Sequence, residues 1–198
     1  MISETKPDLA LLLYDGVPEG FEDDFLEAVS NAGVSIKSAR SSSGPFAGLE
    51  LFLPFAVMLF IGKAYFDGFI SKAGQNHYEL LAASTKKLWW RTFGLQWTLF
   101  GSQAKISQSS KYNIGWAVVG EVNSKLRFKL IIQLTADAAE GDDAIEAFFE
   151  LIRSLHFGEL RQEDFDALMT YSAVGGTVLV TFDGIDKRIV PVNWKQKT

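Results

Sequence analysis

Residues 51–70, LFLPFAVMLFIGKAYFDGFI, constrain the fold more than any other part of the chain. Fifteen of these 20 residues are apolar, and none of residues 51–61 is charged. Polar residues then recur at every fourth position, so on a helix they share one face: Lys63, Asp67, Ser71 and Gln75. A helix that is apolar around the rest of its surface must be buried on most sides, in protein or in lipid. We therefore expect a helix over 52–73 and a second helix over 76–92.

The apolar positions of the first predicted helix are candidates for contact with a bilayer or a partner: Phe52, Phe55, Met58, Phe60, Ile61, Phe66, Phe69 and Ile70. About 20 helical residues span the hydrocarbon core of a membrane. Eleven Leu, Ile, Phe and Val residues in 51–70 would contribute about −5 kcal/mol to insertion, whereas Lys63 and Asp67 would cost about 6 kcal/mol. Because these contributions nearly cancel, an interfacial helix or a bundle with its polar faces together fits better than a lone span.

The second predicted helix ends in TKKLWWRTF, which combines two adjacent tryptophans with three cations. Indole rings lie at the headgroup level of membranes and cations attract anionic lipids. The segment is therefore typical of an interface anchor, which consists of Lys86, Lys87, Trp89, Trp90 and Arg91. Residues 51–94 carry five cations and two acids, whereas 1–50 and 95–198 are each net negative. Adjacent helix positions point about 100° apart, so only one tryptophan can pack in a core.

Two functions are compatible with this helical pair. The favoured hypothesis is a non-enzymatic protein that associates with membranes, as a toxin-like or defence effector whose apolar helix stays covered until a trigger releases it. The alternative is a soluble binding or regulatory module in which the helix over 51–73 is the buried core helix or a homo-oligomer interface. The partners implied are a lipid surface, a protein or a second copy of the chain. Residues 1–14 lack a basic stretch before a long apolar run, so we expect a cytoplasmic protein, peripheral to the inner face of the membrane where it binds lipid.

The flanking sequence predicts an α+β fold in which residues 1–50 and 95–198 form one compact domain. A short apolar run, a helical repeat that ends at Gly33 and an alternating stretch predict a strand–helix–strand unit over 9–14, 19–32 and 34–40. Residues 95–198 predict a mostly antiparallel sheet with covering helices. Its elements are an alternating stretch at Leu95, Trp97 and Leu99, a hairpin of 114–122 and 126–134, helices from Asp142 or Asp143 to Leu155 and over 161–171, and a hairpin of 177–182 and 188–194 around Asp183-Gly184.

No residue pattern predicts catalysis, a cofactor or a metal. The chain has no Cys, which excludes disulfide scaffolds, thiolate zinc sites and cysteine nucleophiles. Its formal net charge of −5 disfavours nucleic-acid binding. Neither His77 nor His156 has a ligand partner at metal spacing. One acidic cluster could bind a hard cation, and it consists of Asp15, Glu19, Glu22, Asp23 and Asp24. Acids at the start of a helix are, however, explained by their favourable interaction with the helix dipole.

Overall fold

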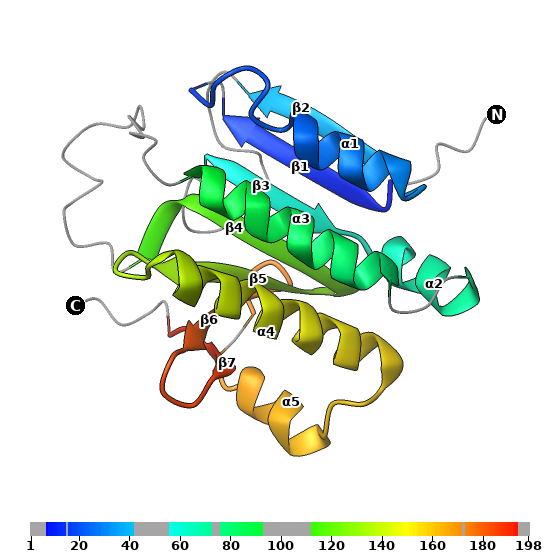
Figure 1. Cartoon of the computed structure of the whole chain (residues 1–198). Helices are drawn as coiled ribbons and strands as arrows, with labels where there is room; N and C mark the ends of the chain where they lie inside the picture. The colour runs from blue at the N-terminus through cyan, green and yellow to red at the C-terminus, as the bar shows by residue number, and fades with distance from the viewer. Residues whose placement is uncertain are drawn as a thin grey trace.

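The computed structural model describes residues 7–14, 16–41, 56–72, 76–92, 112–171 and 173–193. Seven strands form one mixed sheet in the order β2-β1-β3-β4-β5-β6-β7 (Figure 1). The combination of this sheet with packed helices confirms the α+β fold. The elements are β1 (Leu9–Tyr14), α1 (Asp23–Asn31), β2 (Ile36–Ser41), β3 (Val57–Ile61), α2 (Lys63–Lys72), α3 (Asn76–Thr92), β4 (Tyr112–Asn123), β5 (Leu126–Gln133), α4 (Ala138–Phe157), α5 (Gln162–Leu168), β6 (Thr177–Asp183) and β7 (Arg188–Pro191).

The N-terminal strand–helix–strand unit forms as the sequence predicts. Strand β1 alternates between buried and half-buried residues, and it pairs in parallel with β2. Between them, α1 buries Phe25 and Val29 and is followed by Gly33, whose φ of 76° favours glycine. The unit therefore follows directly from its periodicity and its turn residue.

The prediction of one helix over 52–73 is wrong. Residues 57–61 instead form β3, which pairs antiparallel with β1 and in parallel with β4. Helix α2 begins only after Gly62, whose backbone N–H donates to the carbonyl of Asp8. A central strand is buried on both faces, so its sequence is apolar without alternation and has the same pattern as a short piece of buried helix. Residues 51–55 lie outside the described residues.

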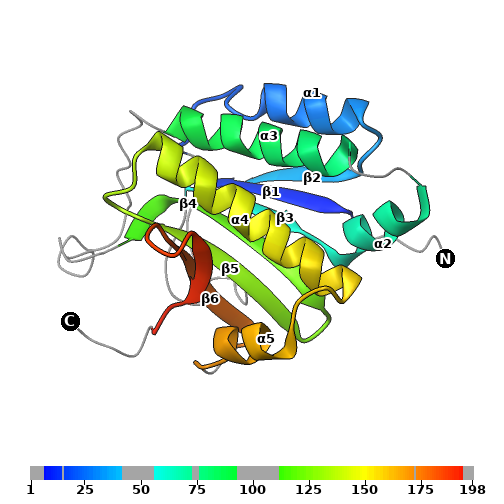
Figure 2. The same cartoon turned by 60° about the horizontal axis from the view of Figure 1, so that its bottom comes forward.

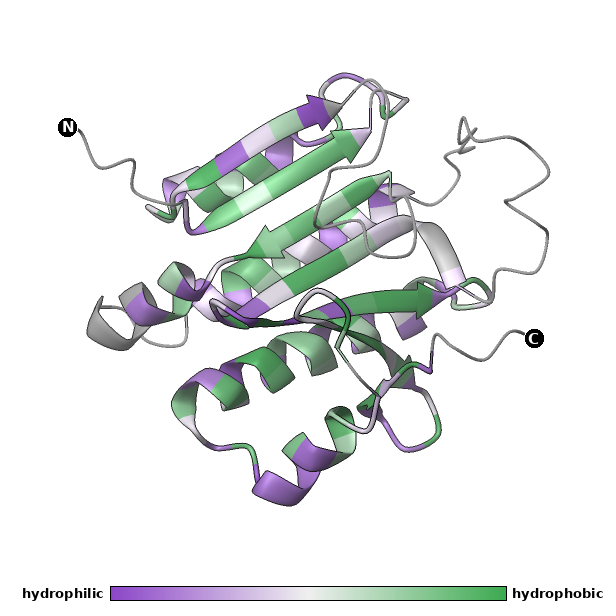
Figure 3. Cartoon of the chain, turned by 180° about the vertical axis from the view of Figure 1, so that it is seen from behind, coloured by the Kyte–Doolittle hydropathy of each residue, from purple (hydrophilic) through white to green (hydrophobic). Residues whose placement is uncertain are grey.

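The main hydrophobic core lies between the sheet and helices α1, α3 and α4, which cover one face (Figure 2). Apolar residues are frequent along the central strands (Figure 3), and because side chains alternate between faces some of them form clusters on the opposite face. Met58 of β3 and Val119 of β4 belong to one apolar cluster there, and Ile131 of β5 and Leu179 of β6 belong to a second. This two-faced burial explains the high apolar content of the strands.

Both predicted C-terminal hairpins are present. Strands β4 and β5 pair antiparallel, and so do β6 and β7, while β5 and β6 pair in parallel. Helix α4 starts earlier than the sequence predicts, because Asp137 is its N-cap and accepts a hydrogen bond from the backbone N–H of Glu140. The stretch at Leu95, Trp97 and Leu99 lies outside the described residues.

Helices α3 and α4 approach closely at Gly141, which is buried in the first turns of α4. A Cβ atom at this position would overlap the indole ring of Trp89. Glycine is therefore required here by the space that the tryptophan occupies.

We expect Gly141→Ala to lower the free energy of unfolding by about 1–3 kcal/mol because the added methyl group overpacks the joint. The sign is diagnostic, since Gly→Ala inside a helix ordinarily stabilises by roughly 1 kcal/mol. Urea unfolding followed by circular dichroism measures the change. A second substitution, Trp89→Phe, replaces the indole by a smaller ring and should recover part of the lost stability. Unchanged or higher stability in Gly141→Ala would contradict the packing.

Candidate functional site

The described members of the predicted membrane-contacting surface lie in the protein core. Met58, Ile61 and Phe66 are buried, and Phe60 is half-buried. Phe52 and Phe55 lie outside the described residues, as do the side chains of Phe69 and Ile70 in α2. Contact with a bilayer through the buried residues would require β3 and α2 to leave the core. Membrane association therefore stays a prediction.

The predicted polar stripe is only partly visible. Lys63 and Asp67 form an exposed ion pair one turn apart on α2. Ser71 lies in the same helix but its side chain is not described, and Gln75 lies outside the described residues. The described part of the stripe thus faces solvent.

Because the Lys63–Asp67 pair is exposed, we expect Asp67→Leu to change the free energy of unfolding by no more than about 0.3–0.5 kcal/mol. If the stripe faced a bundle interior, the loss would be several times larger, since Lys63 would be left buried without its partner. Chemical unfolding at pH 7.5 distinguishes the two cases. Lys63→Leu is the matched control, and it should have an equally small effect.

The two adjacent tryptophans of α3 have different environments, as their 100° separation predicts. Trp89 is 0% exposed and packs edge-to-face on Trp116 of β4, with ring centroids 5.6 Å apart. Trp90 is 55% exposed, and its Nε1–H donates to Asp142 of α4 at 2.8 Å. The first tryptophan is therefore a core residue, whereas the second lies on the surface.

Two of the three cations in the predicted anchor pair with neighbouring helices. Lys86 forms an ion pair with Glu146 of α4. Arg91 pairs with Asp24 of α1 and also donates to the carbonyl of Phe21. Lys87 is exposed. This basic segment thus attaches α3 to both of the helices beside it.

We expect Trp89→Ala to lower the free energy of unfolding by about 3–5 kcal/mol, as is usual for a buried aromatic residue. Trp90→Ala should cost no more than about 1 kcal/mol, because it removes one surface hydrogen bond and partial packing. Parallel urea titrations of the two variants measure the difference. Similar losses in both variants would contradict the assignment of core and surface.

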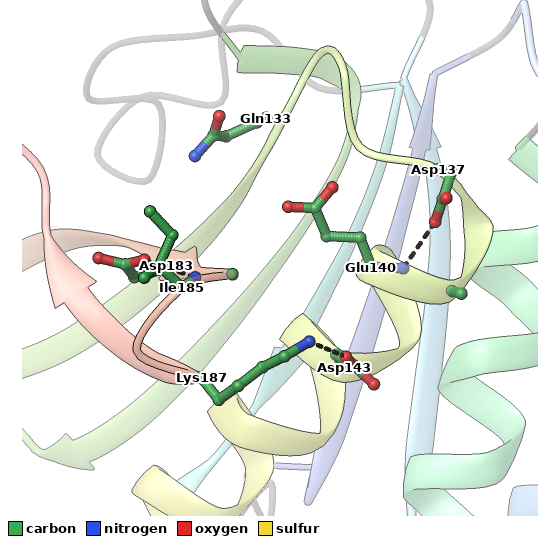
Figure 4. A pocket seen from close by; sticks show the side chains of 9 residues that line it. Gln133, Asp137, Glu140, Asp143, Asp183, Ile185 and Lys187 are labelled. Carbon is green, nitrogen blue, oxygen red and sulfur yellow. Dashed lines mark hydrogen bonds and ion pairs between the residues drawn. The ribbon is translucent and has the colours of Figure 1, made fainter.

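A different feature, which the sequence analysis did not identify, is an open groove at the N-terminal end of α4 (Figure 4). It has a volume of about 570 Å³. Its walls are the first turns of α4 and the turn between β6 and β7, and Gln133 at the end of β5 completes it. We call it the acidic groove, since its charged lining residues are Asp137, Glu140, Asp143, Asp183 and Lys187.

Most of the groove's carboxylates have structural partners. Asp137 caps α4, and Asp183 accepts hydrogen bonds from the backbone N–H groups of Ile185 and Asp186 in the turn. Asp143 pairs with Lys187, and this hydrogen bond is the main cause of a raised lysine pKa. Lys187 also has a φ of 53°, which is uncommon for a residue other than glycine. These contacts fix the turn against α4.

Glu140 is the exception among these acids. Within the described part of the chain, its half-buried carboxylate makes no hydrogen bond or ion pair, and it points into the groove (Figure 4). A glutamate three residues after an N-cap commonly bonds back to the N-cap backbone N–H, which forms a capping box. Here only half of that arrangement forms, since Asp137 accepts from the Glu140 N–H but the glutamate side chain does not return the bond. Its carboxylate is thus available to a ligand.

Exposed apolar side chains surround the same end of the molecule. Ile185, in the β6–β7 turn, is 93% exposed and lines the groove. Leu134, which follows Gln133, is 60% exposed, and the exposed Trp90 is bonded to Asp142 in the first turns of α4. Two of the four large apolar residues found exposed in the described segments therefore lie in this groove or directly after one of its lining residues. Such clusters often mark protein-binding surfaces.

Comparison with known proteins finds no matching family model, curated protein or solved structure. The described residues contain no group of three or more His, Asp or Glu side chains placed to hold a metal ion. Each helix in the described segments is too short or too polar to cross a membrane.

Proposed function

We propose that the protein is a non-enzymatic binding module that recognises a basic, partly apolar segment of a protein partner in the acidic groove. The observation that carries this proposal is the Glu140 carboxylate, which lies in the groove with Lys187 nearby but without a hydrogen bond or ion pair among the described residues. A carboxylate in that position is ready to accept a charge-assisted hydrogen bond from a lysine or arginine side chain.

Charge favours a cationic ligand. The groove lining carries four carboxylates and one lysine, and the whole chain has a formal net charge of −5. A field of this sign accelerates encounter with basic partners and opposes the approach of nucleic acids and anionic lipids. The electrostatics of the groove therefore support a basic ligand.

Apolar residues beside the groove favour a protein ligand over a small cation. Ile185 lines the groove and Leu134 directly follows Gln133 in its wall, so both offer exposed aliphatic surface there. Protein interfaces combine such apolar contacts with a polar rim. A segment with lysine or arginine beside a leucine-type residue would use both parts of the surface.

This proposal corresponds to the alternative of the two functions that the sequence suggests. It is supported by the placement of Met58, Ile61 and Phe66, which belong to the core of a folded domain. It leaves membrane association as the competing hypothesis, to be distinguished by experiment.

We expect the full chain to bind a fluorescein-labelled peptide in which Lys-Leu pairs alternate with Gly. Fluorescence anisotropy at low salt measures this binding. Glu140→Gln should weaken binding about three- to tenfold, or roughly 0.7–1.4 kcal/mol. The affinity should also fall as salt is added, because exposed charges are screened. The matched control is Glu163→Gln, which removes the same charge from exposed α5 outside the groove.

Three outcomes would contradict the proposal. They are an equal affinity for a peptide with Glu in place of Lys, an equal loss in Glu140→Gln and Glu163→Gln, and an absence of binding at low salt. Flotation with vesicles of phosphatidylglycerol tests the competing hypothesis in parallel. Co-flotation without peptide binding would favour membrane association.

A further inference from the structure

The second site of interest lies at the other end of α4, where His156 joins three elements. Its ring stacks on Phe66 of α2, with ring centroids 4.2 Å apart and planes inclined by 12°. Its Nε2 atom lies 2.8 Å from the backbone carbonyl oxygen of Glu121 in β4. The histidine thus contacts both the first turn of α2 and the sheet.

The hydrogen bond determines where the neutral ring carries its proton. A carbonyl oxygen only accepts, so Nε2 must be the donor and Nδ1 carries the lone pair. Nδ1 makes no hydrogen bond within the described residues. Protonation of His156 would place a positive charge on a half-buried ring, which costs hydration of the charged form.

The surroundings of His156 favour the neutral ring. Burial is the largest influence and lowers its pKa, and the charge of Lys63 acts in the same direction. The hydrogen bond to the Glu121 carbonyl and the charges of Asp67 and Glu121 act in the opposite direction without reversing the shift. The stacked ring of Phe66 adds a cation–π attraction, which also favours the charged ring.

Helix α2 is also attached through Tyr65 and Phe66, which are buried in the main core, and through two further hydrogen bonds. The Glu121 carboxylate accepts a hydrogen bond from the backbone N–H of Lys63 at 3.0 Å, at the start of the helix. The hydroxyl of Tyr65 donates to the carbonyl of His77 in α3 at 3.1 Å. Two anchoring contacts of α2, the Phe66 stack and the Glu121 bond, therefore meet at the His156–Glu121 pair.

We propose that His156 is a pH-sensitive latch that holds α2 against β4 and α4 at neutral pH and releases it under mildly acidic conditions. In the released state the imidazolium is hydrated, so release relieves the cost of a half-buried charge. The direction follows from linkage: a histidine with a lowered pKa in the docked state favours docking above its ordinary pKa of about 6.5. That preference is lost as the pH falls below about 6.5 and passes the pKa that His156 has in the docked state.

Hydrogen exchange of the full chain, read by mass spectrometry at pH 7.5 and 5.5 and corrected for intrinsic rates, tests the latch. We expect protection of the α2 amides to fall severalfold at pH 5.5, while the central amides of β4 and α4 keep theirs. His156→Gln should abolish this pH dependence, since glutamine can still donate to the Glu121 carbonyl but cannot be protonated. The matched control is His77→Gln, which should retain it.

Equal protection of α2 at both pH values in the unmodified protein would overturn the proposal. So would a pH dependence that persists unchanged in His156→Gln, because another group would then be responsible. Simultaneous loss of protection in α2, β4 and α4 would also overturn it, since that pattern indicates global unfolding rather than local release.

Discussion

The position of β3 between β1 and β4 holds the fold together. Without this five-residue strand, the parallel β1–β2 pair would have no hydrogen-bonded connection to the other four strands. Val57, Leu59 and Ile61 project into the main core, while Met58 packs in a separate apolar cluster on the other face. The strand therefore has to be apolar throughout, and this requirement accounts for much of the unusual composition of 51–70.

The same requirement explains why the sequence predicts β1, α1 and β2 but not β3. The short apolar run of β1, the glycine after α1 and the alternating stretch of β2 are local signals that each fit one element. A strand buried on both faces has no alternation of apolar and polar residues. Because α2 follows β3 directly, the helical spacing of Lys63 and Asp67 gives the impression of a helix that continues back into the strand. The first turn of α4 is missed for a related reason, because Ala138 and Ala139 belong to no apolar stripe and only the cap at Asp137 marks its start.

The tryptophan pair shows how far composition can identify a role. Two indoles with three cations are typical of a membrane interface, yet the same residues here build a joint between helices: Trp89 fills the space over Gly141, and Lys86 and Arg91 pair with acids of α4 and α1. Helical geometry limits the core to one of the two rings but does not specify what the other contacts. The acidic groove is harder still to predict, because Glu140 and Asp183 are separated by more than 40 residues and only the fold of α4 against the β6–β7 turn brings them together.

Helix α4 separates the two sites that we propose. Glu140 lies in its first turn and His156 in its last, so at 1.5 Å per residue the two lie about 24 Å apart along the helix axis. Release of α2 would thus occur at the opposite end of α4 from the groove. Communication between the ends would require α4 to move as a rigid rod, and the close packing of Trp89 on Gly141 beside the groove opposes such a movement. The structure is therefore consistent with two sites that act independently on one shared helix.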